Sequence, residues 1–420
     1  MIIRTAPRII YVGNYSFPER DAGAARVLGI GKALRECGYD VIFAGDGGIV
    51  PSGEEQGRPE DRQADGGFAF QGFRYRRTGD YRPWPRSRLG KLPRYLSLGS
   101  GCLKWLRSTD LTDVSAIIAY HGTSAFLLRL RSLCRRHNIA LIADCTEWFD
   151  PRQLGCSRYG VLWWDNEVRV RLLNTRIGHV IGISSFLEQY YRAKRCHVIR
   201  VPPLVDGEDA MWHTRVRNTS DSGVLRLVYA GVPGKKDLLD NAIKGVRMLR
   251  REGLPVVVDL VGPTRENISA LLARDAGCLD ELGAALRCHG RVPQHLVPQR
   301  LAEADYSFLL RPNLRYAQAG FPTKLVESLS AGVPIITNAT SDIAEYVRDG
   351  KEGILLDGYT PEAFVAGLRR ILSMPRQEWH AMSENARQRA AECFDYRRYV
   401  QPLGEFVREA VAATRANGSP

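Results

Sequence analysis

Short apolar runs rich in β-branched residues alternate with longer amphipathic stretches along most of this chain. The alternation is typical of βα units, in which helices cover a parallel sheet, so the sequence predicts an α/β fold. The strands expected in the first half are Ile9–Val12, Val41–Ala44, Ala116–Ala119, Leu141–Ala143, Val180–Ile183 and Val198–Val201. The helices expected among them are Ala24–Cys37, Ser124–His137 and Trp163–Ile177.

The pattern is interrupted between Asp206 and Gly223, where turn-forming residues replace the apolar period. It then resumes with expected strands at Leu225–Tyr229, Val256–Val261, Ser307–Leu310, Ile335–Thr337 and Ile354–Leu356. The helices expected in this half are Leu238–Glu252, Thr323–Ala331 and Pro361–Ser373. We therefore expect one doubly wound domain over residues 1–205, a linker over 206–223, a second doubly wound domain over 224–385, and C-terminal helices over 386–420, broken near Asp395, that cross back to the first domain. Such a tandem would place a ligand cleft between its domains.

Composition narrows the class of protein. With 420 residues, of which 44% are hydrophobic and 25% charged, the chain matches globular proteins rather than disordered or fibrous ones. No apolar stretch approaches the ~20 residues that cross a bilayer, so we expect neither a membrane span nor a signal peptide. Nine cysteines without a C-x-x-C pair argue against a disulfide framework or a zinc ribbon and indicate reduced thiols in a cytoplasmic protein.

The formal net charge of +13 implies an anionic partner, which could be nucleic acid, a phosphorylated small molecule or a membrane surface. Within Tyr81–Arg107, basic residues are interleaved with bulky apolar side chains, a pattern suited to peripheral contact with the inner-membrane surface. The other interpretation is a loop followed by an ordinary amphipathic helix. Because no nucleic-acid recognition motif is present, we expect no nucleic-acid partner.

The stretch Ala319–Asn338 carries the most informative motif. Its sequence, AGFPTKLVESLSAGVPIITN, predicts a Gly-Phe-Pro loop, a helix from Thr323 and a buried strand. The first amides of a helix are unpaired and its dipole is positive there, so Phe321–Leu325 could hold a diphosphate, with Lys324 supplying a cation. Glu327, one turn deeper, could accept hydrogen bonds from a ribose diol. The alternative is a solvent-facing Lys/Glu pair on a βαβ crossover.

This stretch resembles the donor-nucleotide signature of retaining glycosyltransferases of the family 4 type, also called glycosyl transferases group 1, in a subfamily with a GFPTKLVE motif. Further segments in family order extend the resemblance over nearly the whole chain: GNYSFPERDAGAA at 13–25, VIGISSFLEQY at 180–190, VPPLVD at 201–206, YAGVPGKKDLL at 229–239, GRVP at 290–293 and ITNATSDIAEYVRDGKEG at 336–353. The resemblance implies a GT-B fold, with two Rossmann-like doubly wound domains facing a central cleft. The donor-binding residues it implies are Gly23, Lys235, Lys236, Gly320, Phe321, Pro322, Thr323, Lys324, Leu325 and Glu327.

The chain departs from the family pattern at two positions. The family has two glutamates separated by seven residues; Glu327 matches the second, but Ala319 stands in place of the first, which implies altered contacts to the transferred sugar. The arginine usual in the first donor loop is also absent, because Val232 follows Gly231. Arg311, just after an expected strand, could restore a positive charge near the phosphates or form a structural salt bridge instead.

Candidates for acceptor contacts follow two strands of the first half. His121 and the pair Asp144 and Glu147 come at carboxyl ends of strands, where α/β sites are built. His121 resembles the cleft histidine of the family, and it could bond the transferring sugar or orient the acceptor hydroxyl, although a lone histidine can also be structural. Asp144 or Glu147 could contact acceptor hydroxyls, and capping of the following segment explains both equally well.

The resemblance implies transfer of a sugar from a nucleoside-diphosphate sugar to a hydroxyl, with retention of the anomeric configuration and without a metal or cofactor. Lys236, Lys324 and the helix amides would stabilise the leaving diphosphate, and the sequence has neither an Asp-x-Asp motif nor a clustered set of metal ligands. The acceptor would be a glycan, a lipid-linked sugar or a small molecule, as in polysaccharide biosynthesis. The rivals are an inverting enzyme or epimerase of the same fold and a non-catalytic nucleotide-sugar-binding homologue or partner subunit.

Overall fold

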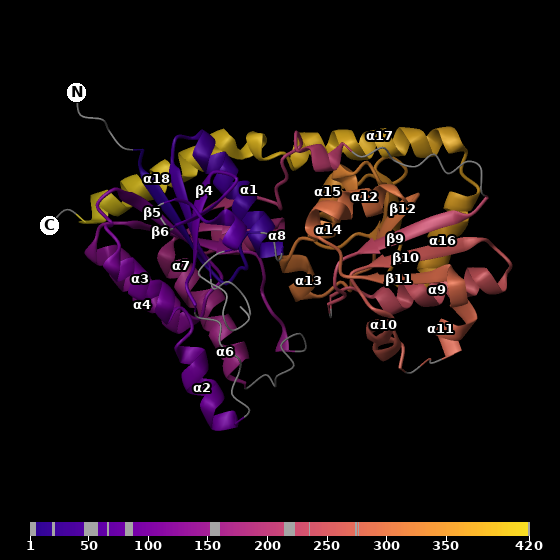
Figure 1. The fold of residues 1–420 in the computed structure, drawn as a ribbon, viewed down its shortest axis with the longest axis horizontal. Coiled ribbons are helices and arrows are strands. Elements are labelled where there is room, and N and C mark those ends of the chain that lie inside the picture. The colour runs from indigo at the N-terminus through magenta and orange to yellow at the C-terminus, as the bar shows by residue number, and fades with distance from the viewer. Residues whose placement is uncertain are drawn as a thin grey trace. The chain divides into compact units, whose positions relative to one another are not determined.

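The computed structural model describes residues 6–18, 22–45, 58–64, 67–79, 87–151, 160–213, 223–234, 236–273, 275 and 277–418. The chain divides into unit 1, Met1–Leu204 with Tyr396–Pro420, and unit 2, Val205–Asp395 (Figure 1). The boundaries between the units therefore lie after Leu204 and after Asp395. The sequence suggested a linker over 206–223 and a boundary after 385. The difference has a physical cause: helix α17 (Arg376–Cys393) runs through position 385 without a break, and the Gly207 amide donates to Asp395 Oδ2 at 3.0 Å.

Unit 1 is built on an eight-stranded sheet in the order β3-β4-β2-β1-β5-β6-β7-β8. Neighbouring strands are parallel except for the β3–β4 pair at the edge. Its strands are β1 (Arg8–Gly13), β2 (Asp40–Gly45), β3 (Phe68–Phe70), β4 (Phe73–Arg77), β5 (Val114–Tyr120), β6 (Ala140–Cys145), β7 (His179–Gly182) and β8 (His197–Arg200). The direction of the connections reverses between β1 and β5, and ligands of such sheets bind outside the carboxyl ends of strands at this switch point.

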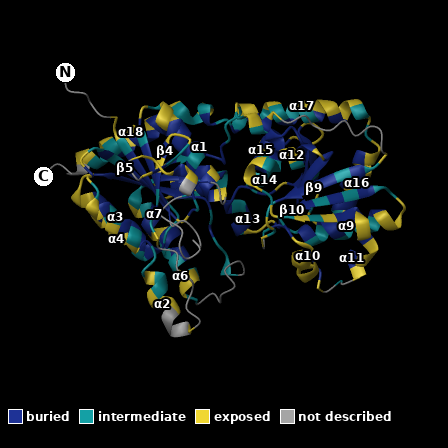
Figure 2. Cartoon of the chain, in the orientation of Figure 1, coloured by how far each residue is buried: buried dark blue, intermediate teal, exposed yellow. Residues whose placement is uncertain are grey.

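Helices cover both faces of the unit 1 sheet, because alternate strand residues point to opposite sides. In β1, Ile9 and Tyr11 join a core with α1 (Ala22–Glu36) and the C-terminal α18 (Val400–Gly418). Ile10 and Val12 join a second core with α3 (Ser100–Ser108) and α4 (Ser124–Arg136). Figure 2 shows these strands buried and the outer helix faces exposed. The other helices are α2 (Arg88–Leu96), α6 (Val161–Val168), α7 (Asn174–Ile177) and α8 (Ser185–Ala193), and a π-helical turn, Arg169–Leu173, joins α6 to α7.

Unit 2 contains a parallel sheet in the order β11-β10-β9-β12-β13-β14, which is 3-2-1-4-5-6 in order of appearance. Its strands are β9 (Leu225–Ala230), β10 (Val256–Val261), β11 (Leu286–Gly290), β12 (Tyr306–Leu309), β13 (Ile335–Asn338) and β14 (Gly353–Leu356). Its helices, besides α17, are α9 (Leu239–Arg251), α10 (Arg265–Leu271), α11 (Gly277–Leu282), α12 (Val297–Ala302), α13 (Arg315–Ala319), α14 (Thr323–Ser330), α15 (Ile343–Tyr346) and α16 (Pro361–Leu372). The switch point here lies between β9 and β12.

The structure confirms the α/β class and two Rossmann-like doubly wound sheets. All expected strands and helices are present with small shifts at their ends, and the expected break near Asp395 separates α17 from α18. The sequence did not predict β3, β4 or β11. β4 (FRYRR) and β11 (LRCHG) were missed because arginine or other polar residues interrupt their apolar runs; alternate residues are buried in β4, and only Leu286 is buried in β11. β3 (FAF) has three residues, too few to show a period.

Candidate functional site

Three charged side chains meet at the switch point of the unit 2 sheet. Asp237 follows β9 and Arg311 follows β12, while Lys324 lies in the first turn of α14. Lys324 Nζ donates to Asp237 Oδ2 at 2.9 Å, and Arg311 Nε donates to Asp237 Oδ1 at 3.1 Å. The Tyr229 hydroxyl adds a third bond to Oδ2 of this carboxylate at 2.7 Å. One carboxylate therefore holds two cations at the edge where α/β sheets bind ligands.

The electrostatics of this cluster favour an anionic ligand. Burial alone would raise the pKa of Asp237, but the charges of Lys324 and Arg311 outweigh it and lower the pKa to about 2. The carboxylate is therefore ionised, and the pKa of Tyr229 is raised by burial and by that negative charge. Two cations against one anion leave an excess positive charge, with Lys324 the more exposed of the two cations.

Lys324 reaches Asp237 by crossing directly over Gly231, the residue after β9. A Cβ at Gly231 would lie 2.5 Å from Lys324 Cε and 3.0 Å from Nζ, and the φ of this glycine is +132°. Only a residue without a side chain fits both the backbone conformation and the path of the lysine. The exposed Val232 follows, at the position where the family pattern has an arginine.

The start of α14 presents amide groups without a side-chain cap. Its N-cap residue is Pro322, whose side chain offers no acceptor, so no side chain bonds the first-turn amides; the Leu325 amide donates to the Pro322 carbonyl at 3.1 Å. The loop before it is fixed from behind, because the Gly320 carbonyl accepts from Ser341 Oγ at 2.6 Å and the Phe321 ring packs edge-on against Tyr346. The sequence predicted the amides of Phe321–Leu325 for a diphosphate; Thr323, at the helix start, is half-buried, whereas Leu325 is fully buried and its amide is bonded within the turn.

Glu327 lies one turn into α14, as the spacing predicted. It is half-buried, and its Oε1 accepts a hydrogen bond from Gln294 Nε2 at 3.1 Å. Burial raises its pKa, although Lys324 and Gln294 partly offset the effect. The alternative of a solvent-facing Lys/Glu pair does not describe this geometry, because Lys324 turns to Asp237 and Glu327 is bonded to Gln294 instead.

The remaining donor candidates lie in three different places. Arg311 is 7% exposed and its guanidinium forms a structural ion pair with Asp237, the carboxylate that also holds Lys324. Lys236 is half-buried in the turn before α9, and Lys235 lies outside the described residues. Gly23 is buried at the start of α1 in unit 1. Ala319, at the position of the absent first glutamate, is fully buried at the end of α13.

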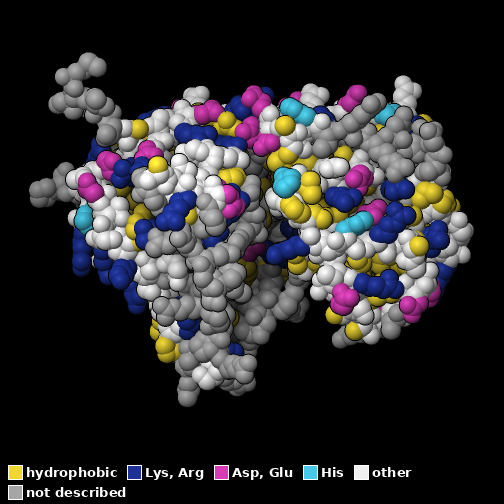
Figure 3. All heavy atoms as spheres, in the orientation of Figure 1, with side chains coloured by type: hydrophobic (Ala, Val, Ile, Leu, Met, Phe, Trp, Pro, Cys, Tyr) yellow, Lys and Arg dark blue, Asp and Glu magenta, His cyan; other side chains and the backbone are white. Residues whose placement is uncertain are grey.

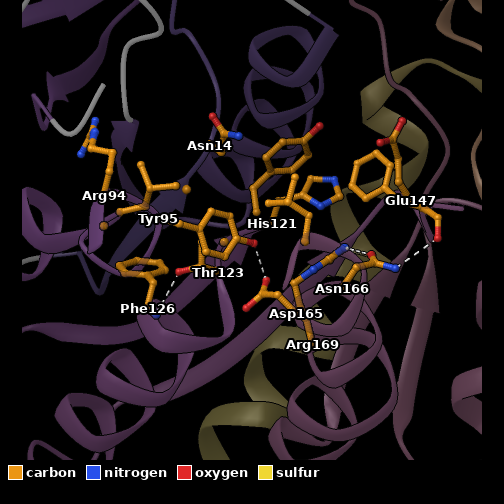
Figure 4. A pocket seen from close by; sticks show the side chains of 17 residues that line it. Asn14, Arg94, Tyr95, His121, Thr123, Phe126, Glu147, Asp165, Asn166 and Arg169 are labelled. Atoms are coloured by element: carbon orange, nitrogen blue, oxygen red, sulfur yellow. Dashed lines mark hydrogen bonds between the residues drawn. The ribbon is translucent and has the colours of Figure 1, made fainter. Parts of the chain in front are cut away.

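Unit 1 has a cavity of about 500 Å³ at its own switch point (Figure 4). It opens where β1 and β5 end and is bounded by α2, α4 and α6. Phe126 is one of its lining residues and lies so close to Gly99 that a Cβ at Gly99, where φ is +81°, would be 2.1 Å from the ring. The polar and charged side chains that line the cavity are Asn14, Arg94, Tyr95, Tyr120, His121, Thr123, Glu147, Asp165, Asn166 and Arg169.

His121 and Glu147 are brought to this cavity, as the sequence predicted for strand ends. His121 directly follows β5 in the left-handed region, with φ +51°, a conformation that is uncommon outside glycine and concentrates at functional sites. Its Nε2 bonds Thr146 Oγ1, and its ring packs edge-on against Tyr120. The backbone and these contacts fix the direction of the imidazole (Figure 4).

Asp144 is a correction to the acceptor candidates. Its carboxylate is buried beneath the sheet edge, where both oxygens bond Arg26 and Oδ2 accepts from the Tyr11 hydroxyl at 2.5 Å. Because the side chain is 0% exposed, no ligand can reach it. Asp144 therefore fastens α1 to β6, and Glu147 alone of this pair lines the cavity.

Sequence reasoning missed the α6 side of the cavity. Asp165 accepts from the Tyr95 hydroxyl at 2.7 Å and from the Ser124 amide at 2.9 Å, which ties α2 and α4 to α6. Asn166 Nδ2 donates to the Phe149 carbonyl at 3.2 Å, and Arg169 donates to Asn166. The sequence offers one signal, three polar residues at helical spacing in a segment otherwise read as an amphipathic helix.

In the described part of the basic and apolar segment 81–107, some apolar side chains are exposed and others line the unit 1 cavity. Residues 81–86 and the side chains of 88–90 lie outside the described part of the chain. Leu92 and Leu96 of α2 are 47% and 45% exposed, whereas Tyr95 and Leu98 line the cavity.

No described helix is both long and apolar enough to cross a membrane. Among the described residues, no group of three or more His, Cys, Asp or Glu side chains is placed to hold a metal ion.

The C-terminal unit matches a known family. Residues 211–389 match the family "Glycosyl transferases group 1". The chain is also similar to a GDP-mannose-dependent alpha-(1-6)-phosphatidylinositol monomannoside mannosyltransferase of Mycolicibacterium smegmatis, 24% identical over 372 residues that cover 79% of this chain and 95% of the other. WcaL of Salmonella typhimurium is 25% identical over 179 residues, 41% of this chain and 42% of WcaL, so that alignment spans less than half of the relative.

Solved structures share the fold of the whole chain. Sucrose-phosphate synthase of Thermosynechococcus elongatus superposes with a TM-score of 0.69 at 16% identity, covering 97% of this chain and 99% of the other. HepE of Anabaena, in complex with UDP and glucose, superposes with a TM-score of 0.64 at 14% identity, again covering 97% and 99%. At such identities the likeness extends to the fold.

Proposed function

We propose that this chain is a nucleotide-sugar-dependent glycosyltransferase of the group 1 type with a GT-B fold, and that it transfers the sugar of a nucleoside-diphosphate donor to an acceptor hydroxyl with retained anomeric configuration and without a metal ion. The observation that carries the proposal is the Lys324 cluster: a lysine held over Gly231 beside uncapped helix amides at the switch point of unit 2. The rival of a non-catalytic nucleotide-sugar binder would keep this cluster and lack turnover.

The donor diphosphate is assigned to Lys324 and the amides at the start of α14. As the bond to the sugar breaks, negative charge grows on the diphosphate, and a cation and amides already in place stabilise it without reorganisation. Glu327, one turn deeper, would accept the hydrogen bonds of the ribose diol, a task for its ionised form. Lys236, in the turn after β9, is the second cation proposed for the phosphates.

The acceptor is assigned to the unit 1 cavity. His121 projects from the end of β5 in a fixed direction and would bond the transferring sugar or orient the acceptor hydroxyl. Glu147 lines the same cavity and is proposed to bond acceptor hydroxyls. A volume of about 500 Å³ suits a sugar or the end of a glycan, whether free or lipid-linked.

Calorimetry tests the donor site first. UDP, GDP, ADP, CMP and TDP are titrated into the full chain with and without magnesium, and the preferred diphosphate is then titrated into Glu327→Ala and Lys324→Ala. We expect one diphosphate to bind without metal and its affinity to fall roughly tenfold or more in each variant, because each removes charge-assisted hydrogen bonds. The matched control is Glu384→Ala, which removes an exposed glutamate on α17 of the same unit.

The outcomes separate the alternatives. Failure of every nucleotide to bind would exclude the transferase assignment. Binding that Glu384→Ala weakens as much as Glu327→Ala would exclude the assigned site. Given binding, hydrolysis or transfer of the matching nucleotide sugar distinguishes an enzyme from a binding homologue, and the anomeric configuration of the product, read by NMR, tests retention.

We further propose that unit 1 contacts an anionic membrane surface through α2 and α3. Leu92 and Leu96 supply exposed apolar side chains, and Lys91, Lys104 and Arg107 are exposed cations nearby in sequence. Figure 3 shows Lys and Arg side chains gathered over α3 and α4 at the left edge of the view. Leu92→Ser/Leu96→Ser should reduce sedimentation with phosphatidylglycerol vesicles; sedimentation equal to that of the unaltered chain would contradict this contact.

A further inference from the structure

Arg169 is a buried cation that has no carboxylate partner among the residues that the structure describes. The residue is 4% exposed, and its side-chain hydrogen bond runs from Nη2 to Asn166 Oδ1, a neutral acceptor, at 2.9 Å. Within the described ranges no carboxylate oxygen lies within 4.0 Å of its guanidinium. A buried guanidinium that lacks an anion is destabilising by several kcal/mol unless another negative group reaches it.

Arg26 shows how the same unit treats an arginine whose role is structural. It is 2% exposed, and its Nη2 lies 2.7 Å from Asp144 Oδ1, while its Nη1 donates to the Val201 carbonyl at 2.8 Å. Each of the three guanidinium nitrogens of Arg26 donates to a protein oxygen, and Arg26 does not line the cavity. Arg169 has comparable burial but lines the cavity, so its missing partner is a group that the cavity admits.

The carboxylate closest in the helix cannot serve as that partner. Asp165, four residues earlier, already uses Oδ1 for the Ser124 amide and Oδ2 for the Tyr95 hydroxyl. Asn166 is held by the Phe149 carbonyl and in turn holds Arg169, so the guanidinium is fixed in place (Figure 4). Arg169 also begins the π-helical turn, a rare backbone form that occurs frequently at functional sites.

We propose that Arg169 binds an oxyanion carried by the acceptor, a phosphate or a carboxylate, and thereby selects acidic acceptors over neutral ones. The planar fork of a guanidinium matches two oxygens of either group. Arg94 lines the same cavity and adds positive charge, and His121, which the proposed function assigns to the acceptor hydroxyl, lines it as well. The inference rests on the proposed function, because that assigns the acceptor to this cavity.

Binding of small sugars tests the selection directly. Glucose 6-phosphate, glucuronate and glucose are titrated into the full chain and into Arg169→Gln. We expect at least one charged sugar to bind roughly tenfold tighter than glucose, and this preference to vanish in Arg169→Gln. The matched control is Arg176→Gln, which removes the same charge from an exposed position on α7 outside the cavity and should keep the preference. The relative affinities of glucose 6-phosphate and glucuronate show which oxyanion is preferred.

The results distinguish this inference from the proposed function. Equal binding of charged and neutral sugars, or a preference that survives in Arg169→Gln, overturns the role of Arg169. Loss of the preference in Lys324→Ala instead would place the anion at the donor site and also overturns it. Diphosphate binding, measured separately, should be unchanged in Arg169→Gln; if no diphosphate binds although Arg169 selects acidic sugars, the donor proposal fails and the acidic site remains.

Discussion

Replacing Asp237 with asparagine isolates the carboxylate that holds the unit 2 cluster together. The side chain is 4% exposed and bonds Lys324 at 2.9 Å, Arg311 at 3.1 Å and Tyr229 at 2.7 Å. The gap between an ordinary aspartate pKa of 3.8 and the value of about 2 in the folded chain corresponds to ~2.5 kcal/mol. In Asp237→Asn the two cations also face each other without an anion, so we expect a loss of about 2–4 kcal/mol.

The sign of the pH dependence follows from the same pKa. Because the pKa of Asp237 is lower in the folded than in the unfolded chain, its contribution to the free energy of unfolding is fully present above pH ~4. It is lost as the pH falls through about 2. At neutral pH the full difference between the unaltered chain and Asp237→Asn should therefore be measurable by urea unfolding followed by circular dichroism.

Asp240→Asn is the matched control for this measurement. Asp240 pairs with Lys244 at 3.0 Å in the same unit, but the two side chains are 28% and 34% exposed. Water screens such a pair, so its loss should cost less than ~1 kcal/mol. If Asp237→Asn and Asp240→Asn unfold at the same urea concentration, the reasoning from burial and pairing is refuted.

Three further predictions follow from single positions. Gly231→Ala should weaken diphosphate binding roughly tenfold in calorimetry, because its Cβ would displace Lys324, while Gly234→Ala, whose Cβ meets open space, should not. Because burial raises the pKa of Glu327, diphosphate affinity should decline on mild acidification, as the carboxylate becomes protonated, and Glu327→Gln should bind weakly with a flat pH profile. Gly99→Ala should lower the free energy of unfolding by about 1–3 kcal/mol more than Gly79→Ala. Both glycines have positive φ, but only the new Cβ at position 99 would collide with the Phe126 ring. These expectations would be contradicted if Gly231→Ala and Gly234→Ala, or Gly99→Ala and Gly79→Ala, had equal effects. They would also be contradicted if the diphosphate affinity of Glu327→Gln changed with pH as that of the unaltered chain does.

The local pattern of the sequence determined much of this protein. Apolar runs of β-branched residues predicted the central strands, because burial on both faces leaves them without interruption. The Gly-Phe-Pro loop and the following helix were predictable because helix termini depend on residues a few positions apart. The same local spacing placed Lys324 and Glu327 one turn apart on α14, and strand ends placed His121 and Glu147 at the edge of their sheet.

Only the tertiary structure decided which charges pair and which remain available to a ligand. Asp144 and Arg26 are 118 positions apart, and Asp237 lies 74 positions from Arg311 and 87 from Lys324. Whether a carboxylate binds a ligand or pairs with another side chain depends on which residues pack over it. Residues distant in the sequence decide this packing, so the local sequence pattern does not predict it. Packing made Asp144 the structural partner of Arg26, and Arg311 the structural partner of Asp237. It also left Arg169 buried beside a cavity with no carboxylate partner in the described part of the chain, because the oxygens of Asp165 bond Tyr95 of α2 and Ser124 of α4.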